Sequence, residues 1–184
     1  MLIQLKKWLN DEKKDTTIFD IVLYGSAVKA KDIPEDIDVV VIFTHGSLKE
    51  RLNKLQSLKK KLKSVEKLHM EGILWQDLFK PEFFARSGIF LEGISLFDGK
   101  PFAQKIDFTG HSLFIYTLKN KTHTDKVKFN YILAGRNNKG MIEKLEGKHL
   151  APGVVQIPIK NSLEFEDVLK KNEISFERKD VLLR

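Results

Sequence analysis

The N-terminal part of the chain alternates apolar runs with a leucine stripe, which predicts a mixed α/β domain. Apolar runs over Ile18–Tyr24 and residues 37–43 are typical of strands. The second run is apolar at both odd and even positions, so we expect it to be covered on both faces of its sheet. A capping box at Ser47 and Glu50 opens a helix whose leucines are expected in the core: Leu48, Leu52, Leu55, Leu58 and Leu62.

Shorter patterns complete this part of the chain. They predict a first helix over residues 2–9, a third strand over 64–74, a helix over 81–85, and a helix or strand over 89–97. A turn sequence follows at residues 98–101, and we expect the first domain to span residues 1–105.

The remainder, residues 106–184, predicts a small α+β module. Its patterns indicate a helix over residues 163–171 and strands over 114–118, 154–159 and 174–183. Phe129 and Tyr131 are expected in the core, because alternate apolar residues usually face inward.

Residues 126–140 of this module combine cations, aromatic side chains and a polar loop flanked by two glycines. Such a mixture can hold a nucleic-acid backbone and stack its bases. The candidate RNA contacts are Lys126, Lys128, Arg136 and Lys139.

Residues with candidate chemistry flank the first two predicted strands. Asp36 and Asp38 lie two positions apart at the start of the second strand, so their carboxylates share one strand face, where they can hold a hard cation such as Mg²⁺. Gly25 lets the backbone approach a phosphate, and Ser26 can open a short helix through Ala30 whose N-terminal amides favour an anion. The alternative is a plain turn, a strand cap and a solvated carboxylate.

This order of residues resembles the signature of the DNA polymerase β-like nucleotidyltransferase superfamily: an apolar residue, Gly-Ser, a short gap, then Asp-apolar-Asp-apolar. The resemblance covers about residues 17–98 and is nearest to the minimal nucleotidyltransferases of prokaryotes. It implies a mixed sheet with flanking helices. It also implies that Asp36 and Asp38 bind Mg²⁺ or Mn²⁺, that Gly25 and Ser26 bind a nucleoside triphosphate, and that a nucleoside monophosphate is transferred to a hydroxyl acceptor.

The same resemblance implies a third carboxylate on the strand after the long helix, and this chain departs from it there. The matching position, between two apolar residues, is His69. Glu71 shares its strand face and Glu66 does not. A neutral imidazole is a poorer Mg²⁺ ligand than a carboxylate. The residues therefore support the fold of this superfamily more strongly than they support its catalytic activity. The alternative is that His69 is simply a polar residue on a half-exposed strand.

Three functions therefore remain open. The first is a transferase whose acceptor is RNA, a protein or a small molecule. The second is a catalytically weak or inactive fold that serves as an RNA- or ribosome-associated binding protein. The third is an antitoxin-like minimal transferase with a protein partner.

Charge favours a polyanionic partner such as RNA or a ribonucleoprotein. The formal net charge is +7, and residues 49–67 contain eight Lys or Arg against two Glu. The alternative for this segment is an ordinary solvated helix face.

Composition sets broad limits on the protein. The chain has 184 residues, of which 42% are hydrophobic, enough for a packed core, and the absence of Cys excludes disulfides and thiolate metal sites. No apolar run reaches the roughly 20 residues of a membrane span, and the start lacks the pattern of a signal peptide. We expect a cytoplasmic protein.

Overall fold

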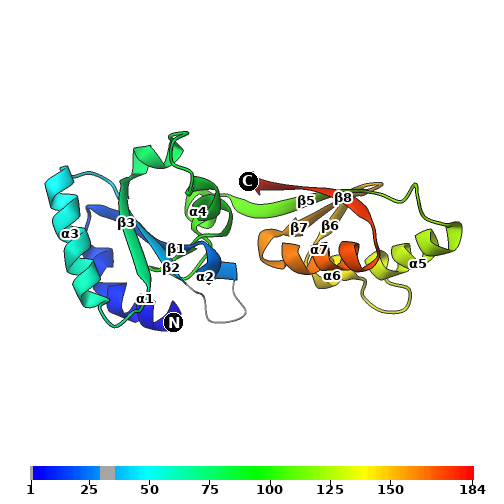
Figure 1. The fold of residues 1–184 in the computed structure, drawn as a ribbon, viewed down its shortest axis with the longest axis horizontal. Helices are drawn as coiled ribbons and strands as arrows, with labels where there is room; N and C mark the ends of the chain where they lie inside the picture. The colour runs from blue at the N-terminus through cyan, green and yellow to red at the C-terminus, as the bar shows by residue number, and fades with distance from the viewer. Residues whose placement is uncertain (1, 30–35) are drawn as a thin grey trace. The chain divides into compact units, whose positions relative to one another are not determined.

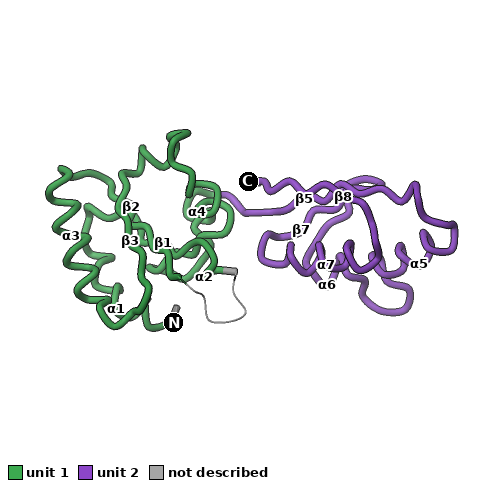
Figure 2. The backbone as a smooth tube through the Cα atoms, in the orientation of Figure 1, with its two compact units in different colours: residues 1–107 green, residues 108–184 purple. Residues whose placement is uncertain are grey.

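The computed structural model of the chain describes residues 2–29 and 36–184. It divides into two compact units, residues 1–107 and 108–184 (Figure 2), where the sequence placed the boundary after residue 105. Each unit combines one four-stranded sheet with helices, so the expectation of a mixed α/β protein is confirmed. Within the described residues, no helix is both long enough and apolar enough to cross a membrane.

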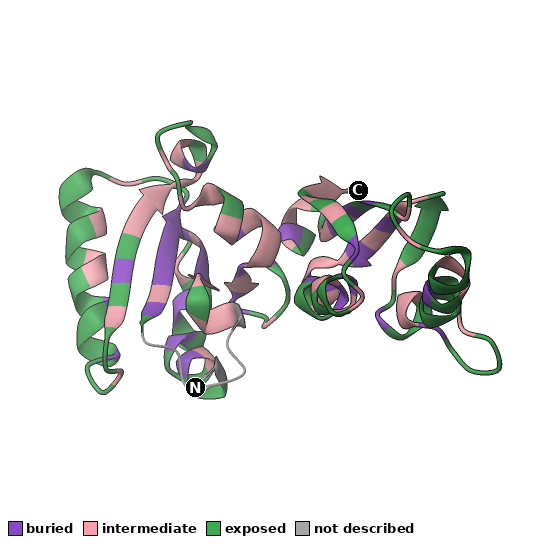
Figure 3. Ribbon diagram, turned by 45° about the vertical axis from the view of Figure 1, so that its right-hand side comes forward, coloured by how far each residue is buried: buried purple, intermediate pink, exposed green. Residues whose placement is uncertain are grey.

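The sheet of the first unit is mixed, in the order β3-β2-β1-β4 (Figure 1). Its strands are β1 (Ile18–Tyr24), β2 (Ile37–Phe43), β3 (Leu68–Leu74) and the short β4 (Ile94–Ser95). β1 pairs antiparallel with β2 and with β4, whereas β2 pairs parallel with β3. Buried residues concentrate in β1 and β2, the two central strands (Figure 3).

Both faces of this sheet are covered, as the apolar pattern of β2 predicted. One face packs against α1 (Leu2–Leu9) and α3 (Leu48–Lys61) through residues that include Leu9, Val41 and Leu58. The other face, which carries Val40 and Ile42, packs against residues of the 3-10 helices η2 (Trp75–Phe79) and η3 (Phe102–Ile106) and of α4 (Arg86–Glu92). The second face has aromatic contacts, among them Phe19 with Trp75 at 4.5 Å between ring centroids.

Helix α3 begins at the predicted capping box, but its leucine stripe is only partly in the core. The Glu50 amide donates to Ser47 Oγ at 3.3 Å, and the Ser47 amide donates to Glu50 at 2.7 Å. Leu58 and Leu62 are buried, whereas Leu48 and Leu52 are 64% and 50% exposed. At 3.6 residues per turn, Leu48 and Leu52 lie about 80° and 120° around the helix from Leu58, which turns them out of the core.

A buried carboxylate connects α3 to the 3-10 helix η1 (Asn10–Lys14). Glu12 is 4% exposed and forms ion pairs with Lys54, at 2.6 Å, and with Lys61. Lys54 also contacts Asp15 at 2.6 Å. Burial alone would raise the pKa of Glu12, but the hydrogen bonds from both lysines outweigh it and hold that pKa below its ordinary value.

The predictions around Pro81 and residues 64–67 were wrong in detail. Residues 80–85 form successive turns rather than a helix, and α4 begins only at Arg86. The ambiguous stretch 89–97 contains the end of α4 and then β4. β3 begins at Leu68, because Lys67 takes a left-handed φ of 54° that ends the preceding turn.

The second unit has an antiparallel sheet in the order β6-β7-β5-β8, covered on one face by helices. Its strands are β5 (Thr109–Thr117), β6 (Lys148–Ala151), β7 (Val154–Pro158) and β8 (Ser175–Leu183). The helices are α5 (His123–Ala134), α6 (Met141–Lys144) and α7 (Ser162–Lys171). With α5 and α6 together forming one crossover, this is a split β-α-β arrangement.

The core prediction in this unit was right for Phe129 and wrong for Tyr131. Phe129 is buried at 3% exposure, whereas Tyr131 is 46% exposed. The segment is helical, so residues two positions apart point in different directions, and Leu133, four positions after Phe129, takes the next core position.

The contacts of Lys54 predict how stability depends on pH. The hydrogen bond from Lys54 lowers the pKa of Asp15 to about 2, so this stabilisation is present above the ordinary carboxyl pKa near 3.8 and is lost as the pH falls towards 2. Replacing Lys54 by Met should lower the free energy of unfolding at neutral pH by about 1 to 2 kcal/mol and reduce its loss between pH 4 and pH 2. Urea denaturation across this pH range measures both effects.

The matched control is Lys59→Met, which removes an exposed lysine from the same helix. It should leave the pH dependence unchanged. An equally steep loss of stability in Lys54→Met and in the wild type would contradict the assignment.

Candidate functional site

One end of the first sheet is polar, on the face that also carries Val40 and Ile42. The register pairs Tyr24 of β1 with Asp38 of β2, and Asp38 with His69 of β3. Residues paired in this way share a sheet face, so the three side chains form a row across three strands. The rest of this face is covered by the aromatic core, which leaves the row as its polar margin.

Asp38 and His69 are neighbours with solvent access. Asp38 Oδ1 lies 3.7 Å from His69 Nδ1, and the two side chains are 29% and 71% exposed. This separation is longer than a hydrogen bond, so the imidazole does not occupy the lone pairs of the carboxylate. As far as the described residues show, both groups can still contact a ligand.

The Gly-Ser turn lies directly against the carboxylate of Asp38. Gly25 has a φ of +75°, and a Cβ built on it would lie 2.6 Å from Asp38 Oδ2. Only glycine allows both this backbone conformation and this approach. Helix α2 (Ser26–Lys29) starts at Ser26 as predicted, while Ala30, its expected last residue, lies outside the described residues.

Asp36 is exposed and immediately precedes β2. Its backbone carbonyl accepts a long hydrogen bond, 3.5 Å, from Ser26 Oγ. The structure thus brings four of the predicted residues, Gly25, Ser26, Asp36 and Asp38, to one end of the sheet, with His69 beside them.

Tyr24 also belongs to this site, although no motif in the sequence pointed to it. The Tyr24 hydroxyl donates to Glu71 Oε1 at 2.8 Å and holds that carboxylate over the same sheet face. Burial, the hydrogen bond to Glu71 and the charges of Glu71 and Asp38 all raise the pKa of Tyr24. The strand register reveals this role, because it pairs Tyr24 with Asp38. Glu66, the other candidate carboxylate, lies in the turn before β3.

The residues at this margin fit a hard divalent cation in part. Asp36 and Asp38 offer the oxygen ligands that Mg²⁺ prefers, whereas His69 offers a nitrogen that suits Mn²⁺ better. Among residues 2–29 and 36–184, no three His, Asp or Glu side chains are already arranged as a metal site.

The four predicted RNA contacts belong to the second unit and line different surfaces of it. Arg136 and Lys139 line a pocket at the loop after α5, and Lys128 lines a different pocket with Lys121 and Asp125. Lys126 is half-buried on α5 and lines neither pocket.

Comparisons with protein-family models, with curated proteins and with solved structures found no match to this chain. Its function is therefore inferred from the geometry of the residues described above.

The hydrogen bond between Tyr24 and Glu71 predicts a coupled titration. In a Tyr116→Phe, Tyr131→Phe background, Tyr24 is the only remaining tyrosine. Its phenolate should form at a pH well above the ordinary pKa of a tyrosine. Glu71→Gln should lower the pKa of Tyr24, because the carboxylate that stabilises the neutral phenol is lost. Ultraviolet absorbance during an alkaline titration measures the phenolate.

Glu66→Gln removes a nearby charge outside the site and serves as the control. The same titration curve in the Glu71→Gln and Glu66→Gln proteins would show that Glu71 does not hold the Tyr24 hydroxyl.

Proposed function

We propose that the first unit is a nucleotidyltransferase of the polymerase β-like type, which transfers a nucleoside monophosphate from a nucleoside triphosphate to a hydroxyl acceptor. The observation that carries this proposal is the contact between Gly25 and Asp38. It joins a turn suited to phosphate with a carboxylate suited to a divalent cation, and nucleotidyl transfer needs both at one point.

The arrangement of elements supports the same proposal. The Gly-Ser turn follows β1, the two aspartates open the antiparallel neighbour β2, and His69 lies on the parallel strand β3 that follows the long helix. These are the positions that the superfamily's signature assigns to the turn, the two aspartates and the third carboxylate.

Each residue then has a defined role. Ser26 and the backbone amides near Gly25 bind triphosphate oxygens, and Asp36 and Asp38 hold Mg²⁺ or Mn²⁺. When bound there, the cation would supply positive charge next to the transferring phosphate. The acceptor oxygen forms a bond to the α-phosphorus, the bond from that phosphorus to the bridging oxygen breaks, and pyrophosphate leaves. His69, exposed beside Asp38, is positioned to take the proton of the acceptor.

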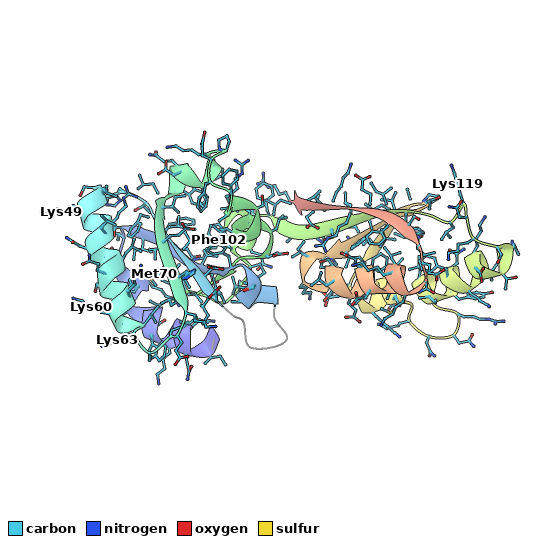
Figure 4. All side chains as sticks on the ribbon, viewed as in Figure 1. Lys49, Lys60, Lys63, Met70, Phe102 and Lys119 are labelled. Carbon is cyan, nitrogen blue, oxygen red and sulfur yellow. The ribbon has the colours of Figure 1, made fainter. Side chains whose placement is uncertain are left out.

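A second candidate function is nucleotide-dependent RNA binding without efficient catalysis. His69 favours it, because an imidazole stands where the superfamily has its third carboxylate. The basic outer surface of α3 and the turn after it favours it as well, since Lys49, Lys60 and Lys63 are exposed and project away from the sheet (Figure 4). In this case RNA is a ligand rather than the acceptor.

The first test of the proposal concerns metal and nucleotide. Mn²⁺ or Mg²⁺ should raise the affinity for a nucleoside triphosphate in the wild type, because a cation relieves the repulsion between the aspartates and the phosphates. Asp36→Asn with Asp38→Asn should abolish this metal dependence and change the free energy of unfolding by less than about 1 kcal/mol, since both residues lie at the strand mouth. Isothermal titration calorimetry with and without metal measures the linkage.

Two glycine variants separate local strain from damage to the site. Gly25 and Gly46 both have positive φ, but a Cβ at Gly46 would meet nothing closer than 3.7 Å. Gly25→Ala should therefore abolish metal-linked binding, whereas Gly46→Ala should retain it. Metal-linked binding that survives in the double Asn variant would place the site elsewhere.

The second test decides between catalysis and binding alone. We expect nucleotidyl transfer by the wild type to be slow with Mg²⁺ and faster with Mn²⁺, because His69 brings a nitrogen ligand without fixed charge. His69→Asp should raise the rate with Mg²⁺ by about tenfold or more, since a carboxylate is the better Mg²⁺ ligand. Incorporation of labelled nucleotide into total RNA, with Glu66→Asp as control, measures the rate.

Rapid transfer with Mg²⁺ in the wild type and no gain in His69→Asp would assign the third ligand to Glu71. No transfer in either protein, with intact metal-linked nucleotide binding, would favour the second candidate function.

A further inference from the structure

The second unit has a pocket of about 440 Å³ where the loop of residues 135–140 joins α5 to α6. Its lining includes three cationic residues, Arg136, Lys139 and Lys144, and no acidic residue. Tyr131 and Ile132 of α5 form an apolar part of the same lining. The pocket thus combines positive charge with an apolar, partly aromatic wall.

The loop is held in one tight conformation by its two glycines. Gly135 has a φ of +80°, and a Cβ there would lie 2.0 Å from the Asn138 carbonyl oxygen. A Cβ on Gly140 would lie 2.2 Å from the Leu133 carbonyl oxygen. Because the backbone folds back onto the end of α5 so closely, the pocket is formed before any ligand binds.

An exposed ring lies at this pocket, with two cations that have no acidic partner among the described residues. The Arg136 guanidinium lies 5.3 Å from the centroid of the Tyr131 ring, and that side chain is 46% exposed. Within the described part of the chain, Lys139 pairs with Glu143 at 2.8 Å, whereas neither Arg136 nor Lys144 has an acidic partner. Arg136 and Lys144 therefore keep their donors available to an anion.

We propose that this pocket binds a nucleotide of a single-stranded nucleic acid, with the base stacked on Tyr131 and Ile132 and the phosphates at Arg136 and Lys144. Proteins that bind single strands combine aromatic platforms with cations that follow the backbone, and this pocket offers both within one loop. A cavity of about 440 Å³ lies within the usual range for small-ligand pockets. Duplexes fit less well, because their bases are already stacked.

This site differs from the RNA contacts predicted from sequence. Tyr131, assigned then to the core, supplies the stacking surface, and Lys144 replaces Lys126 and Lys128 as a phosphate contact. It is also independent of the proposed nucleotidyl transfer, since it needs neither a metal nor a triphosphate.

The test measures fluorescence anisotropy of a short labelled oligouridylate with the full chain in EDTA. Tyr131→Leu should weaken binding about tenfold, whereas Tyr131→Phe, which keeps the ring, should bind like the wild type. Arg136→Ala with Lys144→Ala should reduce the slope of log affinity against log salt by about 0.7 for each lost phosphate contact. The control Lys119→Ala with Lys171→Ala removes two exposed cations that do not line the pocket and should leave that slope unchanged. Figure 4 labels Lys119.

Further arms identify the ligand and separate this site from the first unit. Oligothymidylate should also bind, while double-stranded RNA and inorganic polyphosphate should compete poorly. The double variant Asp36→Asn, Asp38→Asn should bind the oligouridylate like the wild type, so failure of nucleotidyl transfer leaves this result untouched. Equal affinity of Tyr131→Leu and Tyr131→Phe, equal competition by polyphosphate, or no binding in EDTA would each overturn the proposal. Circular dichroism confirms that each variant is folded.

Discussion

The parallel pairing of β2 with β3 determines what the first unit can do. It runs from Ile37 opposite Leu68 to Phe43 opposite Leu74, and it places His69 beside Asp38. Because side chains alternate between the faces of a strand, a slip of one residue would drive Asp38 into the core under α3 and expose Val39. The cost of burying the carboxylate of Asp38, the one polar residue of β2, opposes that slip. The geometry of the polar margin thus depends on this residue together with the apolar packing around it.

Two aspartates of this unit show what burial requires of a carboxylate. Asp20 is fully buried in β1, and burial raises its pKa, although Lys105 at 2.7 Å and a hydrogen bond from Ser95 at 2.9 Å oppose the shift. Asp38 is partly exposed, and among residues 2–29 and 36–184 its nearest cationic partner is the imidazole at 3.7 Å. Lys105 and Ser95 compensate the carboxylate of Asp20, so this residue has a structural role. The carboxylate of Asp38 is accessible to a ligand, as a binding group requires.

The sequence predicted features set by local rules and missed those set by tertiary contacts. The capping box of α3 and the start of α2 follow from residue spacing alone. The shared face of Asp36 and Asp38 stays a prediction, because Asp36 precedes β2. The exposure of Leu48, Leu52 and Tyr131 depends on which helix face meets a sheet, and the bond from Tyr24 to Glu71 depends on strand register. The pocket at residues 135–140 could not be predicted without knowing that α5 is helical. The alternation of Phe129 and Tyr131 indicated instead that both side chains face inward.

In the loop between Gly135 and Gly140, different residues determine the fold and face a ligand. Its conformation depends on two positions that admit no side chain, while the four residues between them are exposed. Those four can therefore change over generations with little effect on folding, as long as both glycines persist. A segment of this kind can acquire a new ligand preference by single substitutions, because selection for a stable scaffold and selection for recognition act on different residues.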